Sequence, residues 1–310
     1  MLINKKKLKN FLNFYWLRPE NAIVKYFQSY SWSDIKWKGK SVDISTGDGS
    51  YVFLHCGGEF DEKFDFYIDT KSEKFTHKKF VDIYDSFSKK YKPIIKKIPD
   101  KKFTIGTDWK DGLLAKAKCL NFFNKTIKHD NNFLPFPFED SEFKFIHSNS
   151  LYWTNNPVKL LKDVNRVLDK DGLAVLEFST QNMLSTLYDL KPILNKAAFN
   201  ILDRKRTLEM KGIKGDIKDW VNYIKKSNFI IEDIRWAWPN KIITDFWNTG
   251  LRPISHLLIK MANNMSISER KKIKKEWVNI FYEILLPLST KPKTYNPKKA
   301  SYVTFIIRKK

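Results

Sequence analysis

The sequence predicts an α/β fold built on a doubly wound, mostly parallel sheet with an antiparallel last strand and helical insertions. Two observations predict it. Three short apolar runs end in an aspartate, at Asp43, Asp108 and Asp130, and a turn with Gly47 and Gly49 follows the first of them. Apolar runs that alternate with helical patterns are typical of parallel βαβ units. A glycine turn after such a strand lets the backbone approach a ligand closely.

The first elements follow from local patterns. Residues 1–40 are predicted to be a helical, aromatic segment that packs on a domain formed by residues 41–310. Pro19 is placed to open a helix, because proline is favoured in the first helical turn. The domain is expected to carry insertions at about 57–100, 179–215 and 240–300.

Two acids compete for the end of the second strand of the domain. Asp69 lies 20 residues after Gly49, which is the usual spacing for an acid that binds a ribose, whereas Asp108 lies 59 residues after it. From Asp108 the chain has room for one helix over 111–122 and one short strand before Asp130, as a compact α/β unit requires. The interpretation therefore favours Asp108 over Asp69 and treats 57–100 as an insertion.

The second half of the domain is assigned in the same way. The pair Asn156-Pro157 indicates a helix start, and Gly172 is expected to end that helix. Asp216 is expected to open the helix before the sixth strand. The remaining strands are predicted at Phe143–His147, Leu173–Phe178, Phe229–Trp236 and Tyr302–Ile307.

The insertion at 240–300 contains a predicted long helix over 266–286. Ser266 and Glu269 can form a capping box, and Pro287 is expected to end the helix. Such a basic amphipathic helix is compatible with peripheral contact to an anionic membrane, but packing over the core with the charges in water is favoured. The predicted apolar face consists of Ile273, Trp277, Ile280, Phe281 and Ile284, and the basic face of Arg270, Lys271, Lys272, Lys274 and Lys275.

Residues 41–178 resemble the class I S-adenosylmethionine-dependent methyltransferases, in particular the small-molecule, methyltransferase type 11-like branch. The resemblance is carried by Asp130-Asn131-Asn132-Phe133-Leu134-Pro135-Phe136, by the helix pattern of 160–168 and by Asp171-Gly172-Leu173-Ala174-Val175-Leu176. Ser45 departs from the family, which has a glycine there. The resemblance implies a Rossmann-like sheet closed by the last strand as an antiparallel edge, and S-adenosylmethionine as cofactor.

The resemblance also implies the roles of individual residues. The glycine-rich loop would face the methionine part of the cofactor, Asp108 the ribose, and Asp130 with its neighbours the adenine. Residues 148–152 would face the methyl group and the acceptor. The predicted cofactor-binding residues are Asp43, Ser45, Thr46, Gly47, Gly49, Asp108, Trp109, Asp130, Asn131, Asn132, Ser148 and Asn149.

Catalytic and acceptor-binding residues are predicted from their place beside the methyl-facing loop. His147 is the one histidine expected there and is a candidate general base, although a structural histidine at a strand end is the favoured alternative. Tyr152 is a candidate catalytic and substrate-binding residue, and Trp153 a candidate substrate-binding residue, with plain core packing as the alternative. Arg252 is a candidate clamp for a carboxylate or phosphate, with a structural ion pair at a helix end as the alternative.

Composition limits the class of partner. The chain has 310 residues, a net charge of +23 and a pI near 9.7. Lys supplies 49 of the 57 basic residues, a profile that compositional bias alone can produce, and no nucleic-acid-binding motif is present, so nucleic acid is not the expected partner. Two cysteines and five histidines offer no metal-ligand spacing, so no metal site is expected. The absence of a signal peptide and of long apolar runs indicates a cytoplasmic protein.

These observations favour methyl transfer to a small-molecule acceptor, such as a sugar, a lipid precursor or another metabolite, including an anionic one. The positive charge keeps an RNA- or protein-modifying methyltransferase open as an alternative. The substitution at Ser45 and the distant Asp108 keep a second alternative open, a cofactor-binding scaffold without catalysis.

Overall fold

The computed structural model describes residues 4–72, 83–84, 91–211, 216–238, 241–290 and 299–310. Segments of all three predicted insertions lie outside the described residues.

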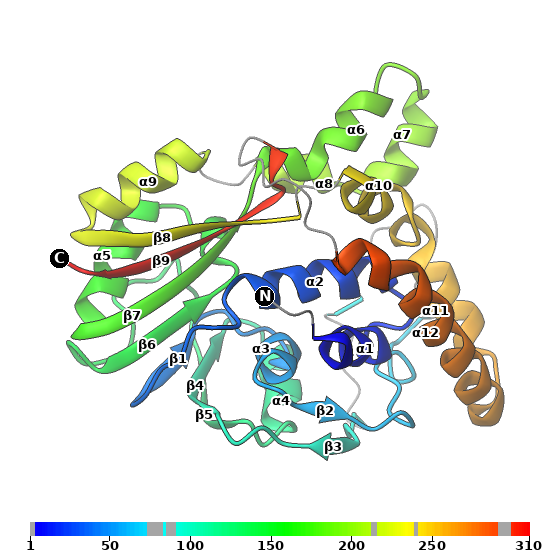
Figure 1. Cartoon of the computed structure of the whole chain (residues 1–310), viewed down its shortest axis with the longest axis horizontal. Helices are drawn as coiled ribbons and strands as arrows, with labels where there is room; N and C mark the ends of the chain where they lie inside the picture. The colour runs from blue at the N-terminus through cyan, green and yellow to red at the C-terminus, as the bar shows by residue number, and fades with distance from the viewer. Residues whose placement is uncertain (1–3, 73–82, 85–90, 212–215, 239–240, 291–298) are drawn as a thin grey trace.

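A seven-stranded sheet is the centre of the described chain, with the order β5-β4-β1-β6-β7-β9-β8 (Figure 1). Strands β5, β4, β1, β6 and β7 pair in parallel, and β9 pairs antiparallel with both β7 and β8. The predicted α/β fold with an antiparallel last strand is thus confirmed. The strands are β1 (Ser41–Asp43), β4 (Phe103–Asp108), β5 (Phe123–Lys128), β6 (Phe143–Ser148), β7 (Leu168–Ser179), β8 (Phe229–Ala237) and β9 (Tyr302–Lys309).

The predicted position of the last strand is wrong. β9 lies between β7 and β8, and β8 forms the edge. The physical reason is visible in burial, because residues Tyr302–Ile307 are all buried whereas β8 exposes several of its residues. A strand without an exposed face belongs in the interior of a sheet.

Two layers of helices cover the sheet. On one face α5 and α9 pack against apolar side chains of β1, β6, β7 and β9. On the other face α1, α2 and α3 form a large aromatic cluster with the sheet, including the buried Trp16 and Trp32. The helices of these layers are α1 (Lys5–Phe14), α2 (Pro19–Ser31), α3 (Ser50–His55), α5 (Pro157–Val167) and α9 (Ile217–Lys226), and α4 (Asp111–Lys118) connects β4 to β5.

The insertions after β7 and β8 are helical and gather to the right of the sheet in Figure 1. They consist of α6 (Ser185–Leu190), α7 (Lys196–Asp203), α8 (Arg206–Lys211), α10 (Lys241–Thr249), α11 (Ser255–Asn263), α12 (Ile267–Thr290) and short 3₁₀ turns at Gln181–Leu184 and Arg252–Ile254. A further 3₁₀ turn, Leu151–Trp153, lies between β6 and α5. The segment after α3 instead forms a small antiparallel pair of β2 (Glu59–Phe60) and β3 (Ile95–Lys97). Asp69 lies in turns and not at the end of a strand.

Predicted helix ends differ from the structure at two positions. α5 begins at Pro157 and its cap Asn156 accepts from the Lys159 amide at 3.0 Å, as predicted, but it ends at Val167 because the next residue is extended. Gly172 lies inside β7 and does not end the helix. Pro287 lies inside α12, which continues to Thr290. Its ring lacks an amide donor and crowds the carbonyl four residues earlier, but its φ is compatible with a helix, so the helix continues through it.

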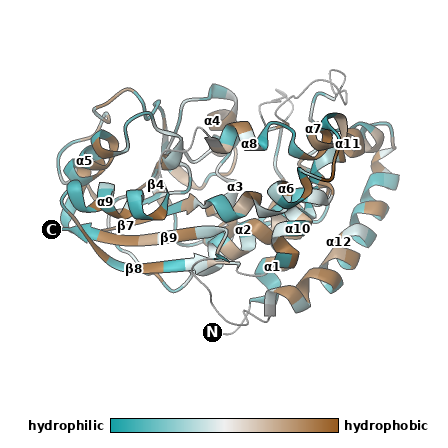
Figure 2. Cartoon of the chain, turned by 90° about the horizontal axis from the view of Figure 1, so that it is seen from above, coloured by the Kyte–Doolittle hydropathy of each residue, from teal (hydrophilic) through white to brown (hydrophobic). Residues whose placement is uncertain are grey.

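The predicted two-faced character of α12 is partly wrong. The capping box exists, since the Glu269 amide donates to Ser266 Oγ at 3.2 Å and the Ser266 amide to Glu269 Oε2 at 2.8 Å. However, Arg270 and Lys274 of the predicted basic face are buried, whereas Ile280 and Ile284 of the predicted apolar face are exposed. Figure 2 accordingly shows hydrophilic and hydrophobic residues mixed around α12.

The segment 59–72 accounts for this difference. Arg270 forms an ion pair with Asp65 at 2.7 Å, and Lys274 Nζ donates to the carbonyl oxygens of Glu62 and Phe64. A charged side chain is tolerated in the interior when such partners are present. Along the described residues no helix is long and apolar enough to cross a bilayer.

Candidate active site

The turn between β1 and α3 has the geometry of a ligand-binding loop. Ser45, Gly47 and Gly49 adopt positive φ values of 60°, 62° and 74°. A Cβ atom added to Gly47 would have no atom within 4 Å, whereas one added to Gly49 would lie 2.7 Å from the Phe123 ring. Gly49 therefore allows close packing inside the protein, and Gly47 leaves open space beside the loop.

Asp108 ends β4 directly beside this loop. Its Oδ2 accepts from the Gly47 amide at 3.0 Å and its Oδ1 from the Lys110 amide at 2.9 Å. Burial raises the pKa of Asp108 above its ordinary value, although these amide donors oppose that shift. A carboxylate offers about four lone-pair positions, so Asp108 retains acceptor capacity for a ligand hydroxyl.

The residues after β5 reach the same loop. Asn131 Nδ2 donates to Ser45 Oγ at 2.7 Å, which joins the two segments. Asp130 Oδ1 accepts from both the amide and the side chain of Asn132, at 2.9 and 3.1 Å. Asn131 Oδ1 and Thr46 Oγ1 are buried without a hydrogen-bond partner. Such unpartnered polar atoms are expected where a polar ligand completes the site.

Three other predicted cofactor residues have different surroundings. Ser148 is buried and donates to the Ile44 carbonyl at 2.7 Å, so it links β6 to β1. Asn149 accepts at its backbone carbonyl from the Tyr302 hydroxyl at 3.3 Å. Trp109 is 57% exposed beside Asp108, which is unusual for so large an apolar ring. Ser148 thus supports the loop from within, whereas Trp109 is open to a ligand.

His147 is held between two carboxylates. Its Nδ1 lies 2.6 Å from Asp43 Oδ1 and its Nε2 lies 2.9 Å from Glu177 Oε2, and its ring stacks on Trp32 with centroids 4.5 Å apart. Burial alone would lower the pKa of His147, but the two carboxylates outweigh burial and raise it to about 9. A fully buried imidazolium with both nitrogens engaged does not act as a general base, so this placement argues against the predicted catalytic role and for the structural alternative.

The partner Glu177 was missed in the sequence. It is fully buried, its Oε2 accepts from the Tyr51 hydroxyl at 2.9 Å, and its Oε1 has no partner. The Lys25 ammonium lies 4.8 Å from the centre of the Tyr51 ring and near enough to Glu177 for their charges to interact. The sequence does contain a signal for Glu177, because it is a charged residue inside the apolar run 173–178.

The predicted acceptor-side residues separate in space and role. Tyr152 is half-buried and meets Phe178 edge-on, with ring centroids 6.2 Å apart, whereas Trp153 is exposed. Arg252 is buried and donates to the carbonyls of Leu202 and Asp203 at 3.1 and 3.0 Å. Those carbonyls end α7, so Arg252 is a structural group at a helix end and not a ligand clamp.

Another arginine, Arg206, was not predicted from the sequence and is close enough to Tyr152 for their charges to interact. Arg206 forms an ion pair with Glu209 at 3.2 Å, lies over the Trp247 ring at 4.7 Å and interacts electrostatically with Tyr152. Its Nε is buried without a hydrogen-bond partner, and burial lowers its pKa.

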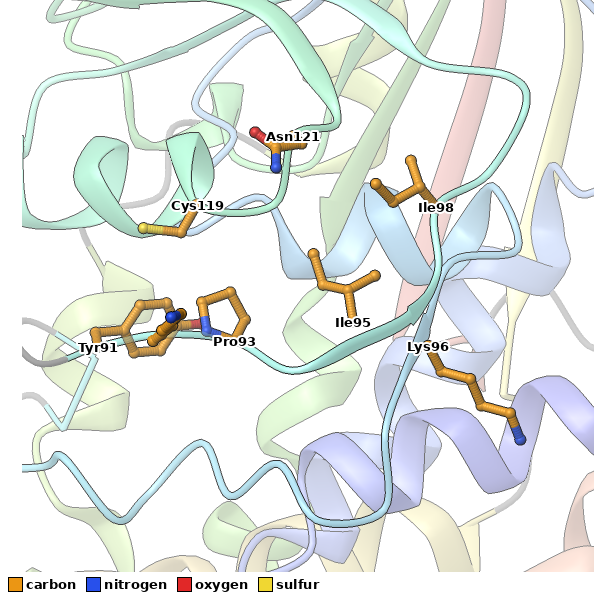
Figure 3. A pocket seen from close by; sticks show the side chains of 8 residues that line it. Tyr91, Pro93, Ile95, Lys96, Ile98, Cys119 and Asn121 are labelled. Atoms are coloured by element: carbon orange, nitrogen blue, oxygen red, sulfur yellow. The ribbon is translucent and has the colours of Figure 1, made fainter.

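A cavity of about 580 Å³ lies outside this constellation, between β3 and the end of α4, and is lined by Tyr91, Ile95 and Cys119 among others (Figure 3). It includes none of the predicted site residues. Among the described residues no group of three or more His, Cys, Asp or Glu side chains is arranged to hold a metal ion.

The comparisons with known proteins agree with this geometry. Residues 94–176, which include Asp108 and Asp130, match the family model for a methyltransferase domain. The chain carries a methyltransferase domain of type 11. The predicted family and enzyme class are confirmed over residues 94–176.

The solved structures add the fold. A SAM-dependent methyltransferase of Thermotoga maritima, described as a possible histamine N-methyltransferase, is similar over 94% of this chain and 92% of its own, with a TM-score of 0.51 and 12% identity. A geranyl diphosphate C-methyltransferase of Streptomyces coelicolor A3(2) is similar over 94% and 84%, with a TM-score of 0.44 and 8% identity. No curated protein matches the sequence. At such low identity the likeness concerns the fold alone.

Proposed function

We propose that this methyltransferase transfers a methyl group from S-adenosylmethionine to a small-molecule acceptor. One observation carries the proposal. The Gly47 amide fixes the Asp108 carboxylate at 3.0 Å, directly beside a position where an added Cβ would meet no atom. A backbone open to a ligand next to an oriented carboxylate is the combination that nucleoside binding requires.

The remaining cofactor contacts come from the two neighbouring loops. Asp108 would accept from the ribose hydroxyls, and Asp130, Asn131 and Asn132 would contact the adenine. Thr46 and the glycine turn would face the methionine part. The unpartnered oxygens of Asn131 and Thr46 support these roles, because a polar ligand would satisfy both. Trp109, exposed beside Asp108, would cover one side of the nucleoside.

The acceptor would bind where the helical insertions follow β7 and β8. Tyr152 supplies a half-buried ring backed by the buried Phe178, and Arg206 supplies a guanidinium with an unpartnered Nε. These groups suit an acceptor that joins an apolar part to a carboxylate or phosphate. S-adenosylmethionine supplies an activated methyl group, so the chain's own residues need only align the acceptor and exclude water. No general base is assigned.

The test is calorimetric titration of the purified chain with S-adenosylhomocysteine. We expect micromolar binding that is weakened about 100-fold or more in Asp108→Ala, which removes an oriented charged acceptor worth about 3 kcal/mol. Asp69→Ala is the matched control, because Asp69 lies in turns outside the site, and it should bind like the wild type. Absence of binding by the wild type, or equal losses in both variants, would contradict the assigned site.

Acceptor screening follows cofactor binding. Carboxylate- and phosphate-bearing small molecules are expected to give turnover, and Arg206→Met is expected to raise KM for them at least tenfold with an unchanged affinity for S-adenosylhomocysteine. Turnover on RNA with a steep salt dependence would instead support the nucleic-acid alternative. Tight cofactor binding without turnover on any acceptor class would support a scaffold.

A further inference from the structure

A second concave site lies away from the glycine turn and Asp108. It has a volume of about 200 Å³ and is formed by α1, by β2 and β3, and by α12. Its lining includes five lysines, Lys9, Lys96, Lys271, Lys274 and Lys275. We call this site the lysine pocket. Its lysines come from three separate parts of the sequence, so only the fold brings them together.

The lysine pocket has an excess of positive charge. Its lining contains two carboxylates, Glu59 and Glu62, against the five ammonium groups. Glu59 is already paired with Lys6, which does not line the pocket, at 2.6 Å. Within the described residues Lys9, Lys96, Lys271 and Lys275 have no ion pair with a carboxylate. The lining therefore keeps an excess of positive charge that its two carboxylates do not neutralise.

Hydrogen bonds of buried side chains also hold the lining of the lysine pocket in place. Lys274 is 4% exposed, and its Nζ donates to the carbonyls of Glu62 (3.1 Å) and Phe64. Burial lowers the pKa of Lys274 to about 8. Asn13 Nδ2 is fixed to the Phe60 carbonyl at 3.3 Å. In Figure 3 Lys96 extends away from Ile95 and Ile98 toward a neighbouring helix, which agrees with its place in this second pocket.

These features select the ligand chemistry. A cleft lined by one sign of charge concentrates the field and attracts multiply charged counter-ions. Lysine binds phosphate as a point charge, and several lysines together favour a doubly charged phosphate over a carboxylate. About 200 Å³ is below the 300 Å³ typical of pockets for whole ligands, so it suits a phosphate group rather than an entire nucleotide.

We propose that the lysine pocket binds a phosphate monoester or pyrophosphate group, carried by a free small molecule or by a lipid headgroup. This site is distinct from the cofactor site and does not depend on the proposed acceptor. The proposal gives a role to the basic residues of α12. Contact of the whole helix with a membrane does not explain them, because Ile280 and Ile284 lie on the opposite side of the helix from Lys271 and Lys275.

The chain offers a matched control for the test. Lys271 and Lys275 line the pocket, whereas Lys272 is exposed on the same helix and does not. The probe is pyrophosphate, titrated by calorimetry at about 50 mM salt to limit screening. We expect Lys271→Glu/Lys275→Glu to weaken pyrophosphate binding at least tenfold and Lys272→Glu to change it less than twofold. Affinity for S-adenosylhomocysteine should be equal in the wild type and in both variants, which shows that each protein is folded.

A second probe separates the two sources of phosphate. Phosphatidylcholine vesicles with and without phosphatidic acid are sedimented with each variant. Binding to phosphatidic acid that is lost in Lys271→Glu/Lys275→Glu assigns the pocket to a lipid headgroup, and pyrophosphate binding without vesicle binding assigns it to a free ligand. If the wild type binds neither probe, or if Lys272→Glu loses as much as the double variant, the proposal is overturned.

Discussion

The two halves of the carboxyl edge of the sheet are built by different means. In the half formed by β1, β4 and β5, short loops are joined by backbone amides and small side chains, as in the contacts of Gly47 with Asp108 and of Asn131 with Ser45. In the half formed by β6, β7 and β8, side chains from distant segments meet, as in the contacts of His147 on β6 with Glu177 on β7 and with Asp43 across the boundary on β1.

This difference determines which parts of the edge can be predicted from sequence motifs. A loop held by backbone amides depends on residue types at fixed short spacings, and such spacings are readable. A cluster of buried charges depends on which segments the tertiary fold brings together. Substitutions that change the local backbone should therefore destabilise the first half most, and substitutions that remove a paired charge should destabilise the second half most.

The largest effect is expected in the glycine turn of the first half. Gly49→Ala places a methyl group 2.7 Å from the Phe123 ring at a positive φ, so it should lower the free energy of unfolding by about 3 kcal/mol. Gly47→Ala meets no atom and should lower it by about 1 kcal/mol. Urea denaturation measures both. Equal losses in the two variants would show that packing does not distinguish these glycines.

The second half is tested through pH. The folded pKa of His147 is raised to about 9, above about 6.5 for an unfolded chain, so its stabilisation is complete below pH 6.5 and lost as pH rises through 9. The destabilisation caused by His147→Gln should therefore be up to about 3 kcal/mol greater at pH 6 than at pH 10, since one pKa unit is about 1.4 kcal/mol.

The control for this measurement is His129→Gln. Burial lowers the pKa of His129, so its protonation state does not change above pH 7 and the effect of the substitution should be constant from pH 7 to pH 10. A pH-independent effect of His147→Gln would mean that the imidazole is neutral between its two carboxylates.

A smaller effect is expected for Arg252, which supports the second half from a distance. Arg252→Met leaves the carbonyls of Leu202 and Asp203 without their donors and should lower stability by about 2 kcal/mol. Affinity for S-adenosylhomocysteine should not change. Lys241→Met, which breaks an exposed pair with Asp245, is the control and should cost less than about 1 kcal/mol. A loss of cofactor affinity in Arg252→Met would show that a change in the second half affects binding in the first.

The smallest stability effect is expected for Trp109. Because it is exposed, Trp109→Ala should change the free energy of unfolding by less than about 0.5 kcal/mol. If it covers the nucleoside, the same variant should weaken S-adenosylhomocysteine binding about tenfold, as loss of an aromatic contact does. Unchanged binding would show that Trp109 does not contact the nucleoside and that the loops of the first half bind it without this ring.

The sequence predicted the sheet well, because its strands depend on local signals. Asp108 was preferred to the more usually spaced Asp69 because the intervening helix and strand had to fit, and the structure puts Asp108 beside Gly47. The same logic failed for Gly172 and Pro287, since a glycine or proline is compatible with more than one local structure.

Tertiary partners explain the remaining failures. Arg270 and Lys274 were expected in water, and their burial depends on Asp65 and the carbonyls of residues 62 and 64, which lie about 200 residues away in the chain. Likewise His147 is neutralised by Asp43 and Glu177 only once three strands align. No local pattern contains these partners.

The position of β9 also constrains the order in which the protein can be made. During synthesis β8 leaves the ribosome well before β9, yet its sheet partner in the described structure is β9, which separates it from β7. The nascent chain must therefore hold β8, α10, α11 and α12 without a sheet to join until Tyr302–Lys309 emerges. The Ser31 hydroxyl of α2, which precedes Thr304 by 273 residues, meets Thr304 Oγ1 at 2.7 Å only at that moment. Completion of the half that contains β7 and β8 is thus postponed until β9 has been made, whereas the half formed by β1, β4 and β5 can form earlier.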